Sequence, residues 1–179
     1  AVEIILYALV RIIFNAARKR NEDLLYQATH DQLTGMPNRS YLQTNIYNWI
    51  HDVTRPFSLL YIDLDRFKSI NDSFGHQCGD QLLLDLARRL QTVQPKDSVI
   101  IRHGGDEFVV LTPVVDTDEV MALSRKIIET ICKPYMVNNL KLHIGASIGI
   151  AQYPTHGKSF DILLRSADIA MYESKKIKN

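Results

Sequence analysis

The sequence has little of what marks an extracellular, membrane-spanning or polymer-binding protein. Its two cysteines, Cys78 and Cys132, fit neither a disulfide framework nor a metal-ligand spacing, so we expect a reducing cytosol. Its 21 Lys and Arg against 20 Asp and Glu give a formal net charge of +1. Apart from a short lysine-rich tail there is no basic stretch of the kind that binds long nucleic acids. The longest apolar run, 4–14, is broken by Arg11 and is shorter than the roughly 20 residues of a bilayer span.

Length and composition are those of one globular domain. The chain has 179 residues, of which 46% are hydrophobic and 23% charged, and these values are ordinary for a soluble protein with a buried core. Because it begins with Ala1 rather than Met, we expect a segment of a longer protein. No secretory signal pattern precedes or follows the apolar run.

Residues 2 to about 28 are predicted to form one helix about 40 Å long. Three interpretations remain open: the cytosolic end of a helix that anchors the parent protein to the inner membrane, a parallel coiled-coil linker, or a helix packed on its own domain. Apolar residues at 4-3 spacing favour a linker that dimerises or relays signals: Val2, Leu6, Leu9, Ile13 and Ala16. We therefore divide the chain into a signalling helix, 1–28, and a folded domain, 29–179.

The folded domain mixes helices with strands. The apolar run from Phe57 to Asp63 predicts a buried strand. The other predicted elements are helices at about 39–52, 67–74, 80–93, 117–132 and 159–176, hairpins at 99–111 and 136–142, and a strand through 144–150. This order predicts an α+β fold with a central, mostly antiparallel sheet flanked by helices and a ferredoxin-like core.

The most informative local pattern is the pair Gly104 and Gly105 between two apolar runs, followed at once by Asp106 and Glu107. A Gly-Gly connection predicts a tight hairpin whose primed turn needs φ > 0. Bare backbone lets a bulky ligand approach closely, and adjacent carboxylates suit a divalent cation. The pattern indicates a nucleotide phosphate held through metal, and an ordinary hairpin with a solvated acidic end is the alternative.

Asp63 ends one buried strand and Asp106 begins another. If these strands are neighbours, their carboxylates converge and repel each other. A divalent cation removes that conflict, and Mg²⁺ is typically held by one or two carboxylates together with phosphates and water. The alternative is that Asp63 only solvates the end of a strand.

The segment after the first strand offers groups for the rest of a nucleotide. Backbone N–H groups entering the helix at Phe67 bind anions, and Lys68 adds a point charge for phosphates. The Asp80 carboxylate can accept from both N1–H and N2–H₂ of guanine, with help from Asn71. For either of these two residues, a helix cap or a polar surface position is the alternative.

These residues belong to a larger set of motifs. Five blocks occur in order: Asp31-x-Leu-Thr-Gly35-x-x-Asn38-Arg39, Asp63-x-Asp65-x-Phe67-Lys68-x-x-Asn71-Asp72-x-x-Gly75-His76-x-x-Gly79-Asp80, Arg102-x-Gly-Gly-Asp-Glu-Phe108, Ser147-x-Gly149-Ile150-Ala151 and Ala167-Asp168-x-Ala170-Met171-Tyr172. Over about 29–178 the chain resembles the GGDEF domain of bacterial diguanylate cyclases. The resemblance implies a palm-like fold similar to nucleotidyl cyclases and the condensation of two GTP into cyclic di-GMP with release of pyrophosphate.

The resemblance also implies roles for single residues. Asp63, Asp106 and the carbonyl of Leu64 hold Mg²⁺, with Mn²⁺ as the alternative metal. Asp106 or Glu107 assists removal of the 3′-hydroxyl proton. The remaining implied contacts are with GTP: Phe67, Lys68 and Lys175 at the terminal phosphates, Asn71, His76 and Asp80 at the nucleoside with Asn71 and Asp80 on guanine, and Gly104 and Gly105 at the α-phosphate.

Product symmetry implies a homodimer. Each nucleotide attacks the other, so one domain with one GTP site supplies half of the geometry, and the N-terminal helix can set the pairing. We expect a sensory domain elsewhere in the parent protein. The alternative function is a GTP-binding regulatory module without turnover, which controls an attached cyclic di-GMP phosphodiesterase domain.

Two stretches depart from the family pattern. Pro95 and Ser98 stand where many members have the Arg-x-x-Asp of a product-inhibition site, and Lys96 and Asp97 are out of register. We therefore predict no feedback inhibition through that site. The tail at 175–179 lacks the glycine of the family's Lys-x-x-Gly-Arg-Asn, which leaves its basic role open.

Overall fold

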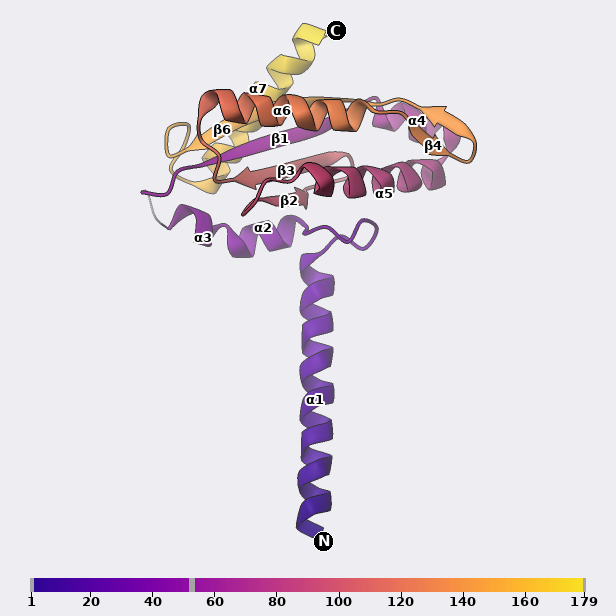
Figure 1. Ribbon diagram of the computed structural model, residues 1–179, viewed down its shortest axis with the longest axis vertical. Coiled ribbons are helices and arrows are strands. Elements are labelled where there is room, and N and C mark those ends of the chain that lie inside the picture. The colour runs from indigo at the N-terminus through magenta and orange to yellow at the C-terminus, as the bar shows by residue number, and fades with distance from the viewer. Residues whose placement is uncertain (1, 52–53, 179) are drawn as a thin grey trace.

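The computed structural model describes residues 2–51 and 54–178, which form helices and strands in the predicted mixed order (Figure 1). The elements are α1 (Val2–Thr29), α2 (Arg39–Asn45), α3 (Tyr47–Ile50), β1 (Phe57–Asp65), α4 (Phe67–Phe74), α5 (His76–Val93), β2 (Val99–Arg102), β3 (Glu107–Thr112), α6 (Thr117–Cys132), β4 (Tyr135–Val137), β5 (Leu140–Leu142), β6 (Gly145–Tyr153) and α7 (Phe160–Lys178).

A four-stranded antiparallel sheet in the order β2-β3-β1-β6 forms the centre of the domain. The strands β4 and β5 form a separate antiparallel pair. The central strand β1 places Asp63 opposite Glu107 of β3 on one side and opposite Ser147 of β6 on the other. The predicted α+β fold with an antiparallel sheet flanked by helices is confirmed.

Both faces of the sheet are covered because β1 is apolar on both sides. Leu60 and Ile62 are fully buried in the core formed with α4, α5 and α6. Leu59 and Tyr61 point to the opposite face, where α2 and α7 cover them. Since side chains alternate along a strand, Asp63 belongs to the α7 face, at the point where the apolar part of β1 ends.

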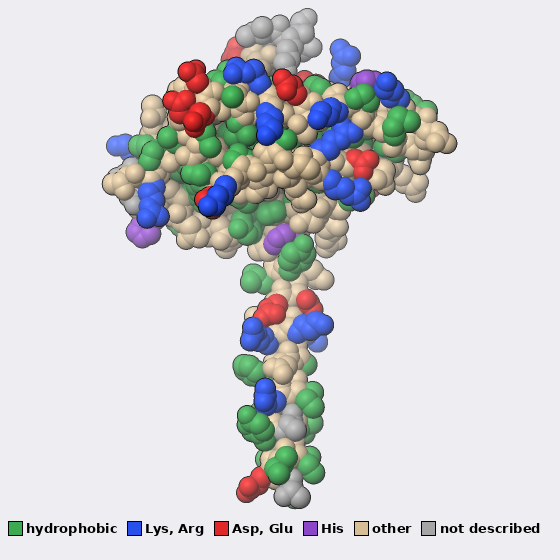
Figure 2. All heavy atoms as spheres, in the orientation of Figure 1, with side chains coloured by type: hydrophobic (Ala, Val, Ile, Leu, Met, Phe, Trp, Pro, Cys, Tyr) green, Lys and Arg blue, Asp and Glu red, His purple; other side chains and the backbone are tan. Residues whose placement is uncertain are grey.

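The helix α1 extends away from the domain as a stalk (Figure 1). Its 28 residues correspond to a length of about 42 Å, and its apolar side chains are exposed, as in Ile4 at 74% and Phe14 at 66%. Hydrophobic side chains lie on several sides of its N-terminal half, below a band of charged groups (Figure 2). The interpretation that this helix packs on its own domain is therefore wrong.

Among the described residues, no helix is both long enough and apolar enough to cross a membrane.

Two helix boundaries differ from prediction. The predicted helix 39–52 is divided into α2 and α3, and its predicted end at 52 lies outside the described residues. The stretch 75–79 between the helices predicted at 67–74 and 80–93, expected to be a turn, is mostly the first part of α5, which begins at His76 rather than at Asp80. The reason is Gly75, which has a φ of +84° and separates α4 from α5 by a single residue. Glycine adopts this conformation without steric cost.

Candidate active site at the diglycine turn

The diglycine turn is wider than predicted. Four residues, 103–106, connect β2 to β3, and among the described residues only Gly35 and Gly75 are glycines with positive φ. The predicted two-residue primed turn is therefore wrong. The N–H groups of His103 and Gly104 both donate to the Glu107 carbonyl, at 2.9 and 3.3 Å, and this shared acceptor closes a longer loop.

The two glycines instead keep space open. No atom lies within 4 Å of where a Cβ on Gly105 would be, while a Cβ on Gly104 would lie 3.0 Å from the Glu107 carboxylate. Side chains at these positions would fill the space above the turn or displace Glu107. The predicted close approach of a ligand to bare backbone is thus compatible with this turn.

The guanidinium of Arg102 stabilises the turn through hydrogen bonds. Its Nε and Nη2 donate to the Gly105 carbonyl at 3.2 and 2.8 Å, and its Nη1 donates to Asp31 Oδ2 at 2.8 Å. Thr34 donates its N–H and its hydroxyl to the same carboxylate oxygen. Burial alone would raise the pKa of Asp31, but the hydrogen bonds from Thr34 and Arg102 outweigh it and hold that pKa below its usual value.

We expect Asp31→Ala to lower the free energy of unfolding at pH 7 by about 2 kcal/mol, because it removes charged hydrogen bonds and leaves Arg102 half-buried without this partner. Since the folded-state pKa is depressed, this stability is present above the unfolded value of 3.8 and is lost as the pH falls through the folded value. Urea denaturation at pH 7 and near pH 3 measures both effects. An equal difference at both pH values would contradict the ion-pair explanation.

Of the two predicted metal-binding carboxylates, Asp63 lies in β1 and Asp106 in the turn that precedes the adjacent strand β3. The Leu64 N–H donates to the Asp106 carbonyl at 3.1 Å, so the end of β1 runs beside the turn. Burial raises the pKa of Asp63, the nearby carboxylates of Asp106 and Asp65 raise it further, and Lys175 partly offsets the rise. Asp106 precedes β3, so the strand's alternation does not fix its side chain. The carboxylates of Asp63 in β1 and Asp106 in the turn thus contribute negative charge to one region.

This donor set fits Mg²⁺. The side chain of Leu64 is a hydrocarbon buried in the core, so this residue can offer a metal only its carbonyl oxygen. In the part of the chain that the structure describes, no three His, Cys, Asp or Glu side chains form a cluster that could hold a metal ion. Two carboxylates and one carbonyl are an incomplete shell, and Mg²⁺ characteristically completes such a shell with phosphate oxygens and water.

A pocket of about 330 Å³ lies beside Asp106 between the turn and the helices α4 and α5. Its volume is within the range of small-molecule sites. It brings together six of the predicted site residues: Phe67, Lys68, Asn71, His76, Gly105 and Asp106. Asp72 also lines it.

The other predicted site residues are not among the described residues that line this pocket. Asp80 is exposed on α5. Glu107 lies on the α7 face of β3, where its carboxylate approaches Tyr61. Burial is the main cause that raises the pKa of the Tyr61 hydroxyl, and the negative charge of Glu107 raises it further. Lys175 reaches the site from α7, where its Nζ lies 2.5 Å from Asp63 Oδ1.

The Asn71 side chain can pack against α5 because Gly79 has no side chain. A Cβ at that position would lie 1.9 Å from Asn71 Oδ1, an oxygen that is buried and has no hydrogen-bond partner within the described residues. The sequence motif contains Gly79, but its contact with Asn71 was not predicted, because 75–79 was expected to be a turn.

We expect Gly79→Ala to lower the affinity for a non-hydrolysable GTP analogue about tenfold, or about 1.4 kcal/mol, because the new methyl group displaces the Asn71 amide. Thermal stability should change little, since alanine is the better helix former by about 1 kcal/mol. Calorimetric titration measures the affinity. Combining the change with Asn71→Ala should add little further loss, and full additivity would contradict the contact.

The stretch that replaces the usual inhibition site is a structural turn. Asp97 has a φ of +58°, the Ser98 N–H donates to the Pro95 carbonyl at 3.3 Å, and the Ser98 hydroxyl donates to Thr112 Oγ1 at 2.9 Å. Ser98 therefore connects the turn to β3. The absence of feedback inhibition stays a prediction.

Comparison with known proteins identifies the family. A family profile described as "Diguanylate cyclase, GGDEF domain" matches residues 28–179. The chain therefore belongs to the diguanylate cyclase GGDEF-domain family.

Its relatives include proteins with several activities. The chain is 36% identical to the bifunctional diguanylate cyclase/cyclic di-GMP phosphodiesterase MucR of Pseudomonas aeruginosa, over 95% of this chain and 25% of MucR. It is 37% identical to the diguanylate cyclase DgcP of Escherichia coli, over 90% of this chain and 48% of DgcP. The chain thus spans between about a quarter and a half of the length of these two relatives.

Solved structures share the fold. A sensory box/GGDEF family protein from Caulobacter crescentus matches with a TM-score of 0.77 and 38% identity, covering 83% of this chain and 99% of that one. The coiled coil and GGDEF domain of DgcB from the same organism, in complex with c-di-GMP, matches with a TM-score of 0.85 at 24% identity, covering 94% and 92% of the two chains. The second similarity shows that the fold agrees over nearly the whole chain.

Proposed function

We propose that this chain condenses two GTP into cyclic di-GMP, with release of two pyrophosphates, as a Mg²⁺-dependent homodimer. The observation that carries this proposal is the place of Asp106 in the wall of a pocket that Asn71 and Lys68 also line, next to the end of β1 that carries Asp63. Family membership supports the same activity. Because GTP is the substrate, we place the reaction in the cytoplasm.

Each side chain then has a defined task. The Asp80 carboxylate accepts hydrogen bonds from guanine with help from the Asn71 amide, His76 contacts the nucleoside, and the backbone at Phe67 with Lys68 meets the phosphates. Asp63, Asp106 and the Leu64 carbonyl would hold the metal, which would supply positive charge to stabilise the phosphate oxygens as negative charge develops.

The bond changes follow from the product. The 3′-oxygen of one nucleotide forms a bond to the α-phosphorus of the other, and the bond from that phosphorus to the bridging oxygen breaks as pyrophosphate leaves. The carboxylate of Asp106 or Glu107 accepts the 3′-hydroxyl proton. The open space at Gly104 and Gly105 leaves room for the α-phosphate. Two such reactions close the ring.

The N-terminal helix supports the homodimer. Residues 1–28 serve as the linker and 29–179 as the catalytic domain in this proposal. Exposed apolar side chains on an isolated helix favour burial against another surface, and a second copy of the same helix would bring two catalytic domains together. A sensory domain before this helix would then control the distance between the two turns.

A regulatory role is the second candidate function. MucR is named as both a cyclase and a phosphodiesterase, and the matched segment is 25% of its length. A GGDEF domain in such a protein can bind GTP without turnover and control the attached phosphodiesterase. The intact acids Asp63, Asp106 and Glu107 favour the catalytic role.

Incubation with GTP and Mg²⁺, followed by chromatography, distinguishes the two functions. We expect cyclic di-GMP and pyrophosphate in a 1:2 ratio at high protein concentration. GTP binding without any product under the same conditions would contradict the catalytic proposal and favour the regulatory one.

A further inference from the structure

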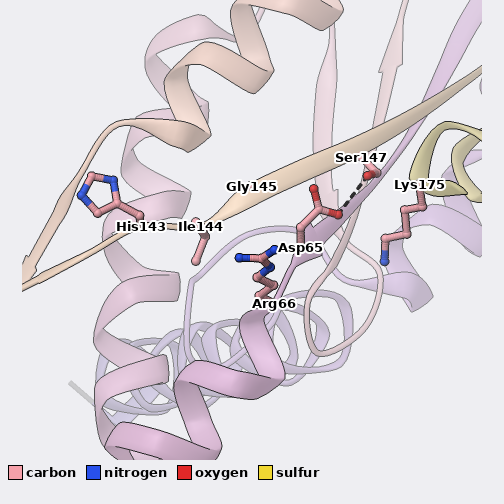
Figure 3. A pocket seen from close by; sticks show the side chains of 7 residues that line it. All are labelled: Asp65, Arg66, His143, Ile144, Gly145, Ser147 and Lys175. Carbon is pink, nitrogen blue, oxygen red and sulfur yellow. Dashed lines mark hydrogen bonds between the residues drawn. The ribbon is translucent and has the colours of Figure 1, made fainter. Parts of the chain in front are cut away.

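Lys175 pairs with Asp63 and also lines a separate cavity. Its ammonium lies 2.5 Å from Asp63 Oδ1, and the two side chains are only 31% and 16% exposed. Lys175 also lines a cavity of about 440 Å³ at the end of β1, together with Asp65, Arg66 and Gly145 among others (Figure 3). The lysine therefore has a carboxylate on one side and an open, water-accessible cavity on the other.

The same Asp63 carboxylate is a proposed ligand of Mg²⁺. An ammonium and a divalent cation at one carboxylate repel each other, and partial burial weakens the screening of that repulsion by water. Metal binding at Asp63 therefore requires Lys175 to move or to be neutralised by another negative charge. The terminal phosphates of a nucleotide would supply such a charge if they entered the cavity that Lys175 lines.

The cavity can receive the released ammonium. One oxygen of Asp65 accepts a hydrogen bond from the Ser147 hydroxyl at 2.9 Å, which fixes that carboxylate. Arg66, exposed at the start of α4, lies on the other side of Asp65 from Lys175 (Figure 3). Once Lys175 leaves Asp63, two cationic side chains flank this cavity, an arrangement suited to terminal phosphates.

We propose that Lys175 is a positioning residue that neutralises Asp63 in the empty site and transfers to the terminal phosphates when the metal and the nucleotide arrive together. This inference rests on the proposed function. It implies that the metal alone binds weakly, that the nucleotide alone binds weakly, and that each strengthens the other. The exchange of one lysine between two anions is the source of that coupling.

A fixed charge would behave differently. If Lys175 only contributed a stationary positive charge, removing it would strengthen metal binding and weaken nucleotide binding, but would leave the factor by which each ligand strengthens the other unchanged. The exchange mechanism predicts that this factor itself falls, because the metal no longer releases a cation for the phosphates.

The test measures Mn²⁺ binding by electron paramagnetic resonance with and without a non-hydrolysable GTP analogue, in the full chain. For Lys175→Met we expect Mn²⁺ alone to bind about tenfold tighter and the coupling factor to fall about tenfold, within the usual range of coupling between sites. Lys175→Gln provides a second neutral variant if the first does not fold. Lys176→Met is the matched control, because Lys176 is exposed and pairs with Glu173, and it should leave both quantities unchanged.

Two results would overturn the inference. A coupling factor unchanged in both Lys175 variants would reduce the lysine to a fixed charge, and an unchanged Mn²⁺ affinity would show that it does not compete with the metal. Both results are compatible with cyclic di-GMP synthesis by the wild type. Failure of the wild type to bind the analogue at all, by contrast, would contradict the proposed function itself.

Discussion

Asp106→Asn is expected to lower cyclic di-GMP formation by about 1,000-fold or more, which corresponds to about 4 kcal/mol of transition-state stabilisation. The amide has the shape of the carboxylate but lacks its charge, so it weakens the metal site and removes a possible proton acceptor. Turnover is measured by chromatography of the product. The same change should lower the pKa of Asp63, because the Asp106 carboxylate is one of the groups that raise it.

The control for this variant is Asp97→Asn. Asp97 lies in the turn before β2 with a φ of +58°, a conformation that asparagine also tolerates, so this change removes one negative charge away from the pocket. We expect full turnover. Turnover of the Asp106 variant within tenfold of wild type would contradict the role of Asp106 in the reaction.

Turnover per domain is expected to fall on dilution, and removal of residues 1–28 should lower it at least about tenfold at low protein concentration. The helix raises the effective concentration of one catalytic domain beside the other, whereas GTP binds to a pocket within one domain. Affinity for a non-hydrolysable GTP analogue should therefore change less than about twofold. Steady-state assays over a range of protein concentrations measure the first effect, and calorimetry measures the second.

Point substitutions in α1 separate dimerisation from length. Leu9→Asp places a charge on the exposed apolar part of the helix, whereas Arg20→Gln changes a polar position further along. The first should reproduce the truncation and the second should not. Equal turnover per domain at high dilution, with and without residues 1–28, would contradict the pairing role of the helix.

The sequence predicted the elements whose signals are local. The continuous apolar run beginning at Phe57 predicts a buried strand, and β1 is that strand, buried on both faces. The helix predicted at about 117–132 is α6, whose N-terminal cap is Asp116, which accepts the Glu119 N–H. Periodicity and caps act over a few residues, so a single sequence is enough to identify them.

The sequence did not predict geometry that depends on distant partners. A Gly-Gly pair permits a primed turn, but the shared carbonyl of Glu107 and the brace from Arg102 hold a wider loop. The contacts Arg102–Asp31 and Lys175–Asp63 join residues 71 and 112 positions apart. No local pattern reports such contacts, although all four residues stand in or beside the motif blocks.

The central claim is that the carboxylates of Asp63 and Asp106 hold one divalent cation beside the nucleotide pocket. The most direct measurement is anomalous X-ray diffraction from crystals of the chain grown with Mn²⁺ and a non-hydrolysable GTP analogue. We predict an anomalous peak in contact with both carboxylates and with a phosphate oxygen. A bound analogue whose metal contacts neither Asp63 nor Asp106, or only one of them, would contradict the account.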